Sequence, residues 1–467
     1  MRHMIKQTVI NNTKFAIGAV LVFLTGQVLG INLIVPACLL SLYLYLELRA
    51  PKLKNYRLLH LALLFVVNFV SSYLIIQQTG VMFFVPFCVI PMLATILYNE
   101  LEISLVITLA CSISVASMLD SHFYLGVIFI ISGIMSSILV LGARKRIAII
   151  RAGFIIGLVQ VLSLLLLDHF WIGLPFRYAV FMLNGVACSI IVLGILPVFE
   201  YLFKTVTNIS LLELADFNHP LLQRMVLEAP GTYHHSLVVG NLSDAACSTI
   251  GANALLARIG AYYHDIGKLD KAEYFGENQD IKDSKHDALT PAMSKLVIIN
   301  HVKEGVELAK KYKLSPRLID FIQQHHGTSL VYYFYRRALE TLEDDHEVKE
   351  EGFRYPGPKP DSKETAIVLL ADSVEAAARA LKDPTPSKIE EVVHKIINNK
   401  FIDGQLDECE LTLKDIENIS TVFIRMLGGI YHSRVTYPER TSKSENNGKK
   451  SSEENSHQPE KDKRSDS

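Results

Sequence analysis

Long stretches without a charged side chain dominate the first part of this 467-residue chain and restrict the folds open to it. Asp, Glu, Lys and Arg are all absent from residues 15–46, 58–99, 103–119, 121–143, 152–167 and 178–199. A helix that crosses a bilayer needs about 20 apolar residues, so each of the first two stretches can hold two helices, with turns near residues 30–32 and 79–80. The sequence therefore predicts a polytopic transmembrane bundle of about eight spans within residues 1–204, with seven as the alternative count.

Lysines and arginines between these stretches predict which way the bundle faces. With eight spans, the cations on one side of the membrane are Arg2 with Lys6, the segments 49–57 and 144–146, and Lys204. Cation-rich loops stay in the cytoplasm, so both termini are expected there. Arg177 falls on the outer side and departs from the rule, which keeps seven spans as the alternative. We expect a multi-pass protein of the cell membrane whose C-terminal domain is cytoplasmic.

The composition changes at about residue 205 to that of a soluble helical domain. Strand-like alternation is absent after this point, so residues 205–440 are expected to form one all-helical domain, and the fold class is all-α. Gly251 should end one helix and Asn253 should cap the next, which Gly267 should end, because glycine favours helix C-termini and asparagine favours N-caps. Residues 441–467 lack apolar side chains and are predicted to be a disordered tail.

Overall charge and cysteine usage exclude some classes of function. The formal net charge of −1 gives the chain no general attraction for a nucleic-acid polymer. None of the six cysteines forms a C-x-x-C pair, so we expect neither disulfides nor a zinc knuckle. The hydrophobic content of 50% is high for a soluble protein and lies mostly in the first 204 residues.

Histidine and aspartate stand together in the predicted helical domain. His235 lies in G-T-Y-H-H-S from Gly231, and His264 precedes Asp265 in G-A-Y-Y-H-D-I-G-K from Gly260. Imidazole and carboxylate groups hold divalent metals, and the two oxygens of a carboxylate allow it to bridge two ions. A neighbouring His-Asp pair therefore suits a centre with two metals.

Seven short phrases carry a family resemblance that covers nearly all of residues 210–437. They are L-L-E-L-A-D-F-N-H-P-L-L from Leu211, E-A-P-G-T-Y-H-H-S from Glu228, G-A-Y-Y-H-D-I-G-K from Gly260, E-N-Q at 277–279, H-H-G-T from His325, F-R-Y-P-G-P-K-P from Phe353 and L-A-D-S-V-E-A-A from Leu370. With this ordered set the chain resembles the HD-domain metal-dependent phosphohydrolases. It resembles more closely the PgpH-type seven-transmembrane HD proteins, which are bacterial membrane phosphodiesterases for cyclic di-AMP.

The resemblance implies a set of metal ligands. One ion would be held by His235, His264, Asp265 and Asp372, and a second, bridged by Asp265, by His301, His325 and His326. Mixed histidine and carboxylate ligands with open positions favour manganese or iron over tetrahedral structural zinc. Lys268, one short turn beyond Asp265, is a candidate catalytic residue that contacts a phosphate oxygen; the alternative is a solvated lysine at a helix end.

Hydrolysis of cyclic di-AMP to linear pApA is the function that the resemblance implies. Two alternatives stay open: an HD phosphohydrolase for another nucleotide, such as cyclic di-GMP, and a membrane receptor whose HD module binds without turnover. The expected partners are a cyclic dinucleotide and the lipid bilayer, and a homodimer is left open. Family members usually carry a large extracellular domain after the first span. Here only the short turn near residues 30–32 could take its place.

Overall fold

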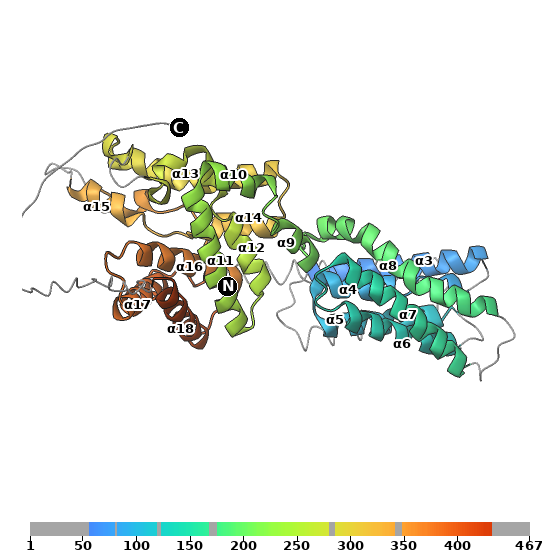
Figure 1. The fold of residues 1–467 in the computed structure, drawn as a ribbon. Helices are drawn as coiled ribbons and strands as arrows, with labels where there is room; N and C mark the ends of the chain where they lie inside the picture. Colours follow the sequence, from blue (N-terminus) through green and yellow to red (C-terminus); the bar gives the residue numbers. More distant parts are fainter. Residues whose placement is uncertain are drawn as a thin grey trace, which may run out of the picture.

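The computed structural model describes residues 56–79, 82–118, 123–167, 175–279, 285–340 and 348–431. Within these ranges the regular structure is helical, and one isolated β-bridge joins Leu330 to Arg354. Two helical assemblies follow each other along the chain (Figure 1). The predicted all-α fold class is therefore confirmed. The predicted spans within residues 15–46 and the predicted tail at 441–467 lie outside the described residues.

Apolar helices make up the first assembly. Their bounds are α3 Tyr56–Thr79, α4 Val89–Tyr98, α5 Leu101–Ala116, α6 Phe123–Val140, α7 Arg146–Leu167 and α8 Pro175–Phe203, with a 3-10 turn, η1, at Met82–Phe84. Among the described residues, helices α3, α7 and α8 are long and apolar enough to cross a membrane, and α4, α5 and α6 are shorter. The total of eight or seven spans stays a prediction, because its first members precede the described part of the chain.

Helices α7 and α8 pack closely through small residues. A Cβ atom on Gly185 would collide with the backbone of Gly157, and one on Gly153 would collide with Ser189. Small residues of this kind let the backbones of two membrane helices approach each other. Helix α7 begins at Arg146, six residues before the charge-free stretch at 152–167. Its first turns can contain Arg151, because the side chain of this residue is exposed.

Helix α4 departs most from the expected spans. Residues 58–99 are long enough for two full spans, but α4 has only 10 residues, all of them buried. That length corresponds to about 15 Å, half the thickness of the hydrocarbon core. The chain before α4 is irregular, and Asn184 Nδ2 on α8 donates to the carbonyl oxygens of Phe83 at 3.2 Å and Val85 at 2.9 Å. Irregular backbone within a membrane needs such protein partners, so α4 is an inner helix of the bundle.

The second assembly is built around α16. Its helices are α9 Asn208–Leu214, α10 Pro220–Glu228, α11 Pro230–Ile250, α12 Ala254–Tyr263, α13 Pro291–Lys311, α14 Pro316–Gln324, α15 Tyr332–Glu340, α16 Lys363–Arg379, α17 Pro386–Ile402 and α18 Leu413–Ile430. Short 3-10 segments are η2 Ile266–Tyr274, η3 Gly276–Asn278, η4 Lys285–Ala288 and η5 Glu350–Phe353. Residues 365–372 of α16 are all buried. Helix α16 therefore forms the centre of the core against α11, α12 and α17.

Two of the three predicted helix signals hold. Helix α11 ends at Gly251 with φ 70°, and the side chain of Asn253 accepts a hydrogen bond of 3.1 Å from the first turn of α12. The prediction that Gly267 ends the following helix is wrong, because α12 ends before His264 and the chain continues into η2. A Cβ atom on Gly267 would collide with the carbonyl oxygen of His301 on α13. This glycine therefore allows the turn after α12 to lie against α13.

A short linker between α8 and α9 joins the two assemblies. Near the end of α8, Glu200 Oε1 accepts hydrogen bonds from Thr207 Oγ1 at 2.6 Å and Ser210 Oγ at 2.7 Å. At the start of α7, Arg146 forms an ion pair of 2.7 Å with Glu213 of α9. The loop at 144–146 and the second assembly therefore lie at the same end of the bundle.

Candidate metal centre

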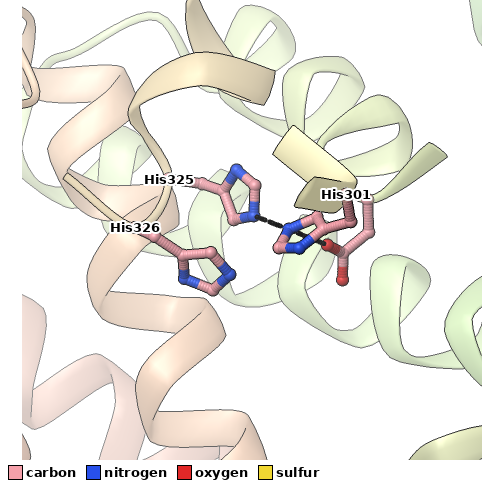
Figure 2. A group of neighbouring side chains, drawn as sticks. His301, His325 and His326 are labelled. Carbon is pink, nitrogen blue, oxygen red and sulfur yellow. Dashed lines mark hydrogen bonds and ion pairs between the residues drawn. The ribbon is translucent and has the colours of Figure 1, made fainter. Parts of the chain in front are cut away.

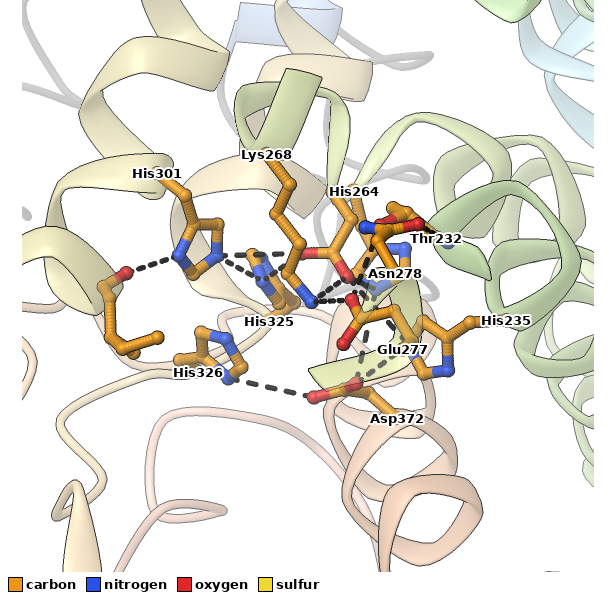
Figure 3. Close-up of polar contacts among 12 residues, drawn as sticks. Thr232, His235, His264, Lys268, Glu277, Asn278, His301, His325, His326 and Asp372 are labelled. Atoms are coloured by element: carbon orange, nitrogen blue, oxygen red, sulfur yellow. Dashed lines mark hydrogen bonds and ion pairs between the residues drawn. The ribbon is translucent and has the colours of Figure 1, made fainter. Parts of the chain in front are cut away.

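Several helices and the turns that follow them bring the predicted metal ligands together at one buried point in the second assembly (Figure 3). The side chains come from α11 (His235), the turn after α12 (His264 and Asp265), α13 (His301), the end of α14 (His325 and His326) and α16 (Asp372). They form two groups that share Asp265, and within each group the candidate ligand atoms lie within 4.8 Å of one another. Segments far apart in the sequence thus supply one cluster.

The two carboxylate oxygens of Asp265 face different groups of histidines. Asp265 Oδ2 lies 3.1 Å from His264 Nε2. Asp265 Oδ1 lies 3.4 Å from both His301 Nε2 and His325 Nε2. A carboxylate that bridges two ions presents its oxygens in this way.

Asp372 and His326 complete the two groups. Asp372 Oδ1 lies 3.1 Å from His235 Nε2, and Asp372 Oδ2 lies 3.5 Å from His326 Nδ1. Figure 2 shows His301, His325 and His326 turned toward one another, and the first two approach to 3.2 Å between their Nε2 atoms. The ring nitrogens therefore point into a common space rather than into solvent.

Backbone carbonyls set the orientation of three of these imidazoles. Nδ1 donates to the carbonyl oxygen three residues earlier in His264 at 2.6 Å, His301 at 2.5 Å and His325 at 2.9 Å. A carbonyl oxygen can only accept, so Nδ1 carries the proton and Nε2 keeps a free lone pair. The Nε2 lone pairs of His301 and His325 thus face each other, an arrangement that a cation between them would stabilise.

Polar atoms at the centre are buried without hydrogen-bond partners. Asp265 is only 1% exposed, and its Oδ2 pairs with Lys268 Nζ at 2.7 Å. Among the described residues, Asp265 Oδ1 and His264 Nε2 form no hydrogen bond. Burial of a charged carboxylate costs several kcal/mol unless it is paired or binds a metal. The neutral imidazoles and carboxylates of this centre are the donors that a divalent cation takes. The residues therefore fit a divalent metal.

The protonation states of most of the cluster suit metal binding. His235 is the exception: burial would lower its pKa, but Asp372 and Glu375 raise it to about 9, so a metal must displace its proton. Burial lowers the pKa of His301 to about 3 and holds the pKa of His326 well below its ordinary value, so both rings are neutral near pH 7. Burial alone would raise the pKa of Asp265 and Asp372. His264 and Lys268 outweigh it at Asp265, and His235 and His326 at Asp372, and hold both pKa values well below the usual range. Neutral imidazole and ionised carboxylate are the forms that coordinate metals.

Glu375 belongs to the centre and was not predicted. Its Oε2 accepts a hydrogen bond of 2.6 Å from His235 Nδ1, and Tyr431 donates to its Oε1 at 3.3 Å. A carboxylate behind a metal-binding imidazole fixes the ring and its tautomer. Glu375 lies three residues after Asp372, on the same face of α16, and this spacing is the signal from which it could have been found.

Lys268 lies at the edge of the cluster between two carboxylates. Its Nζ is 2.7 Å from Asp265 Oδ2 and 2.7 Å from Glu277 Oε1, and Thr232 Oγ1 donates to the same Glu277 oxygen at 3.2 Å. Burial would lower the pKa of Lys268, but the carboxylates raise it far above its ordinary value. The predicted alternative of a freely solvated lysine is wrong, because this ammonium group is held inside the site. Glu277 and Thr232 are further residues that sequence reasoning missed.

Together these features define an all-helical domain with an HD-type metal site behind an apolar helical bundle. Residues 26–207 match the family described as 7TM receptor with intracellular HD hydrolase, and residues 232–377 match the HD domain. The chain therefore belongs to the PgpH-type family of membrane proteins with an HD domain, as the resemblance predicted.

Relatives with this architecture are similar along most of the chain. The cyclic-di-AMP phosphodiesterase PgpH of Bacillus subtilis is 42% identical over 82% of this chain and 55% of its own length. The protein of the same name from Listeria monocytogenes is 38% identical over 88% of this chain and 59% of its own length. The chain thus spans less than two thirds of these relatives. A crystal structure of the L. monocytogenes PgpH HD domain is 48% identical, with a TM-score of 0.44 over 46% of this chain and 100% of that chain.

Proposed function

We propose that this protein is a membrane-bound, metal-dependent phosphodiesterase that hydrolyses cyclic di-AMP to linear pApA. The observation that carries the proposal is the pair of buried ligand groups that share Asp265. The choice of cyclic di-AMP among cyclic dinucleotides is supported by the names of the two PgpH relatives. The names of these relatives also favour an enzyme that hydrolyses the nucleotide over a receptor that binds it without turnover.

Two divalent ions, manganese or iron, are proposed as the cofactors. His235, His264, Asp265 and Asp372 would hold one, and His301, His325 and His326 would hold the other together with Asp265. Bound ions of this type lower the pKa of a bound water and neutralise the charge of a phosphodiester. Donors that buried carbonyls already orient need little rearrangement, which favours tight binding of the ions.

Lys268 is proposed to stabilise negative charge without transferring a proton. Asp265 and Glu277 hold its pKa far above the ordinary value, so the ammonium group does not release its proton near pH 7. Its position 2.7 Å from Asp265 places a fixed positive charge beside the proposed bridging carboxylate. A phosphate oxygen next to Asp265 would therefore meet this cation.

The helical HD domain is proposed to lie in the cytoplasm. The cation-rich loop at 144–146 should be cytoplasmic, and the ion pair between Arg146 and Glu213 holds it at the same end of the bundle as the HD domain. We also propose the division into a transmembrane part at 1–204, the HD domain at 205–440 and a tail at 441–467. This arrangement makes a cytoplasmic nucleotide accessible to a protein anchored in the bilayer.

A time course on the full-length protein tests the proposal. The protein is purified in detergent, loaded with manganese or ferrous iron, and incubated with cyclic di-AMP, cyclic di-GMP or a mononucleotide before chromatography. Linear pApA should accumulate first and AMP should come late, because one cleavage opens the ring and the more highly charged product should leave. Formation of AMP without a linear intermediate would refute the single-cleavage mechanism. Preferential turnover of another nucleotide would refute cyclic di-AMP as the substrate.

A further inference from the structure

Lys400 is a half-buried cation near the candidate metal centre that the proposed mechanism does not use. It lies in the last turn of α17, and its Nζ donates to Ser329 Oγ at 2.7 Å. Ser329 is buried, and its backbone N donates to the carbonyl oxygen of His326 at 3.0 Å. Lys400 is therefore connected through one serine to a residue of the proposed ligand set.

The other cations around the centre are already neutralised. Lys268 contacts Asp265 and Glu277, Arg354 contacts Asp403 at 2.8 Å, and Lys359 contacts Asp407 at 3.5 Å. Lys400, in contrast, has no carboxylate within 4 Å in the described part of the chain. Burial lowers the pKa of Lys400, and the more distant Asp372 and Asp403 offset this only partly. A partly desolvated ammonium group without a counterion is a site that attracts an anion.

Lys400 lies on the more open side of the centre. The side chain of His326 is 19% exposed, whereas those of His301 and His325 are at most 1% exposed. Figure 3 shows His326 and Asp372 along the lower side of the cluster. Ser329 and Lys400 are connected to His326, the most exposed of these histidines.

Hydrogen bonds hold the end of α17 against the turn that contains His326. Gln405 Oε1, just beyond α17, accepts from Thr328 N at 2.8 Å, and Gln405 Nε2 donates to Thr328 Oγ1 at 2.9 Å. Arg354 joins the same turn by donating to the carbonyl oxygen of Thr328 at 2.9 Å. Lys400 is thus placed on a fixed wall of the site rather than on a mobile arm.

We propose that Lys400 and Ser329 form a second phosphate subsite, which holds the phosphodiester of the cyclic dinucleotide that is not cut. The inference rests on the proposed function, because only a substrate with two phosphates needs a second anion site. A lysine has three N–H donors, and Ser329 occupies one of those of Lys400. The subsite would hold the second phosphate while the first meets the metal ligands, and so would select cyclic dinucleotides over single phosphodiesters.

The test compares two substrates on the same sample of full-length protein in detergent. One substrate is cyclic di-AMP, and the other is bis(p-nitrophenyl) phosphate, which has a single phosphate. Lys400→Met should lower the ratio of kcat/KM for cyclic di-AMP to that for the small diester by about 10- to 100-fold, the effect of one hydrogen bond to a charged group. This ratio does not depend on how much of the sample is folded and active.

Two further variants define the controls. Lys400→Arg keeps the charge and should retain most of the wild-type ratio, whereas Lys395→Met removes an exposed lysine of the same helix and should leave it unchanged. If the ratio for Lys400→Met equals that of the wild type, the subsite proposal is refuted and the proposed function is not. The same holds if the ratio for Lys400→Arg is as low as that for Lys400→Met. A wild type that cleaves the small diester but no cyclic dinucleotide overturns the proposed function, and the subsite with it.

Discussion

Replacement of Glu375 should weaken metal binding without removing any proposed metal ligand. Glu375 Oε2 lies 2.6 Å from His235 Nδ1, and both side chains are 2% exposed. The carboxylate therefore sets the ring orientation that directs His235 Nε2 toward Asp372. In Glu375→Ala the imidazole loses this acceptor and can rotate or change tautomer. The metal should still bind, but with lower affinity.

The size of this effect follows from one buried hydrogen bond. A hydrogen bond to a charged group contributes about 1.5–3 kcal/mol, and about 1.4 kcal/mol corresponds to a tenfold change in a binding constant. Glu375→Ala should therefore reduce metal affinity by about 10- to 100-fold, the range found for carboxylates behind metal-bound histidines. Glu375→Gln keeps an acceptor and loses only the charge, so its loss should be smaller, about fivefold to tenfold.

The assay is a chelator titration of the manganese-loaded, full-length protein, with bound metal measured by elemental analysis. Glu391→Gln on α17 removes an exposed carboxylate and serves as the matched control. The melting temperature of each variant is measured in parallel, so that loss of metal is separated from loss of fold. Wild-type metal affinity in a folded Glu375→Ala protein would refute the role of Glu375 in orienting His235.

Three further predictions concern other parts of the molecule. Asp265→Asn keeps the side-chain volume but removes the proposed bridging charge, so metal and activity should be lost together; full metal occupancy in this variant would contradict bridging. Asn184→Leu leaves the buried carbonyls of Phe83 and Val85 without this donor, at about 1–3 kcal/mol for each group. Its melting temperature in detergent should fall by several degrees, and an unchanged value would exclude this role of Asn184. In intact cells, impermeant thiol reagents should label Lys145→Cys no more than they label the native protein. Clear additional labelling would overturn the predicted topology.

In the membrane part, the bounds of most described helices could be predicted from composition to within a few residues. The stretches at 103–119 and 178–199 correspond to α5 and α8, because a lack of charge is itself the requirement for insertion in lipid. Composition could not distinguish α4 from a full span. Its shortness depends on the contact of Asn184 with irregular backbone a hundred residues earlier, which no local pattern encodes.

The proposed ligands of the candidate metal centre could be predicted from the sequence, but two neighbouring carboxylates could not. The residue types and phrases singled out His264, Asp265 and the other proposed ligands, and the structure brings all of them into two adjoining groups. Glu375 and Glu277 were missed, because a carboxylate on a helix or in a loop has many ordinary roles. Their part in the centre depends on contacts with His235 and Lys268 that only the folded chain makes.

The sequence by itself determined the features that depend on neighbouring residues. Charge-free stretches determined where helices could enter a bilayer, and Gly251 and Asn253 determined where one helix ends and the next begins, because backbone conformation and capping are local. Tertiary structure alone decided that Gly267 meets α13, that Glu375 orients a histidine 140 residues earlier, and that Lys400 contacts Ser329 without a carboxylate partner among the described residues. These relations arise from packing between distant helices, and the spacing of residues along the chain contains no measure of it.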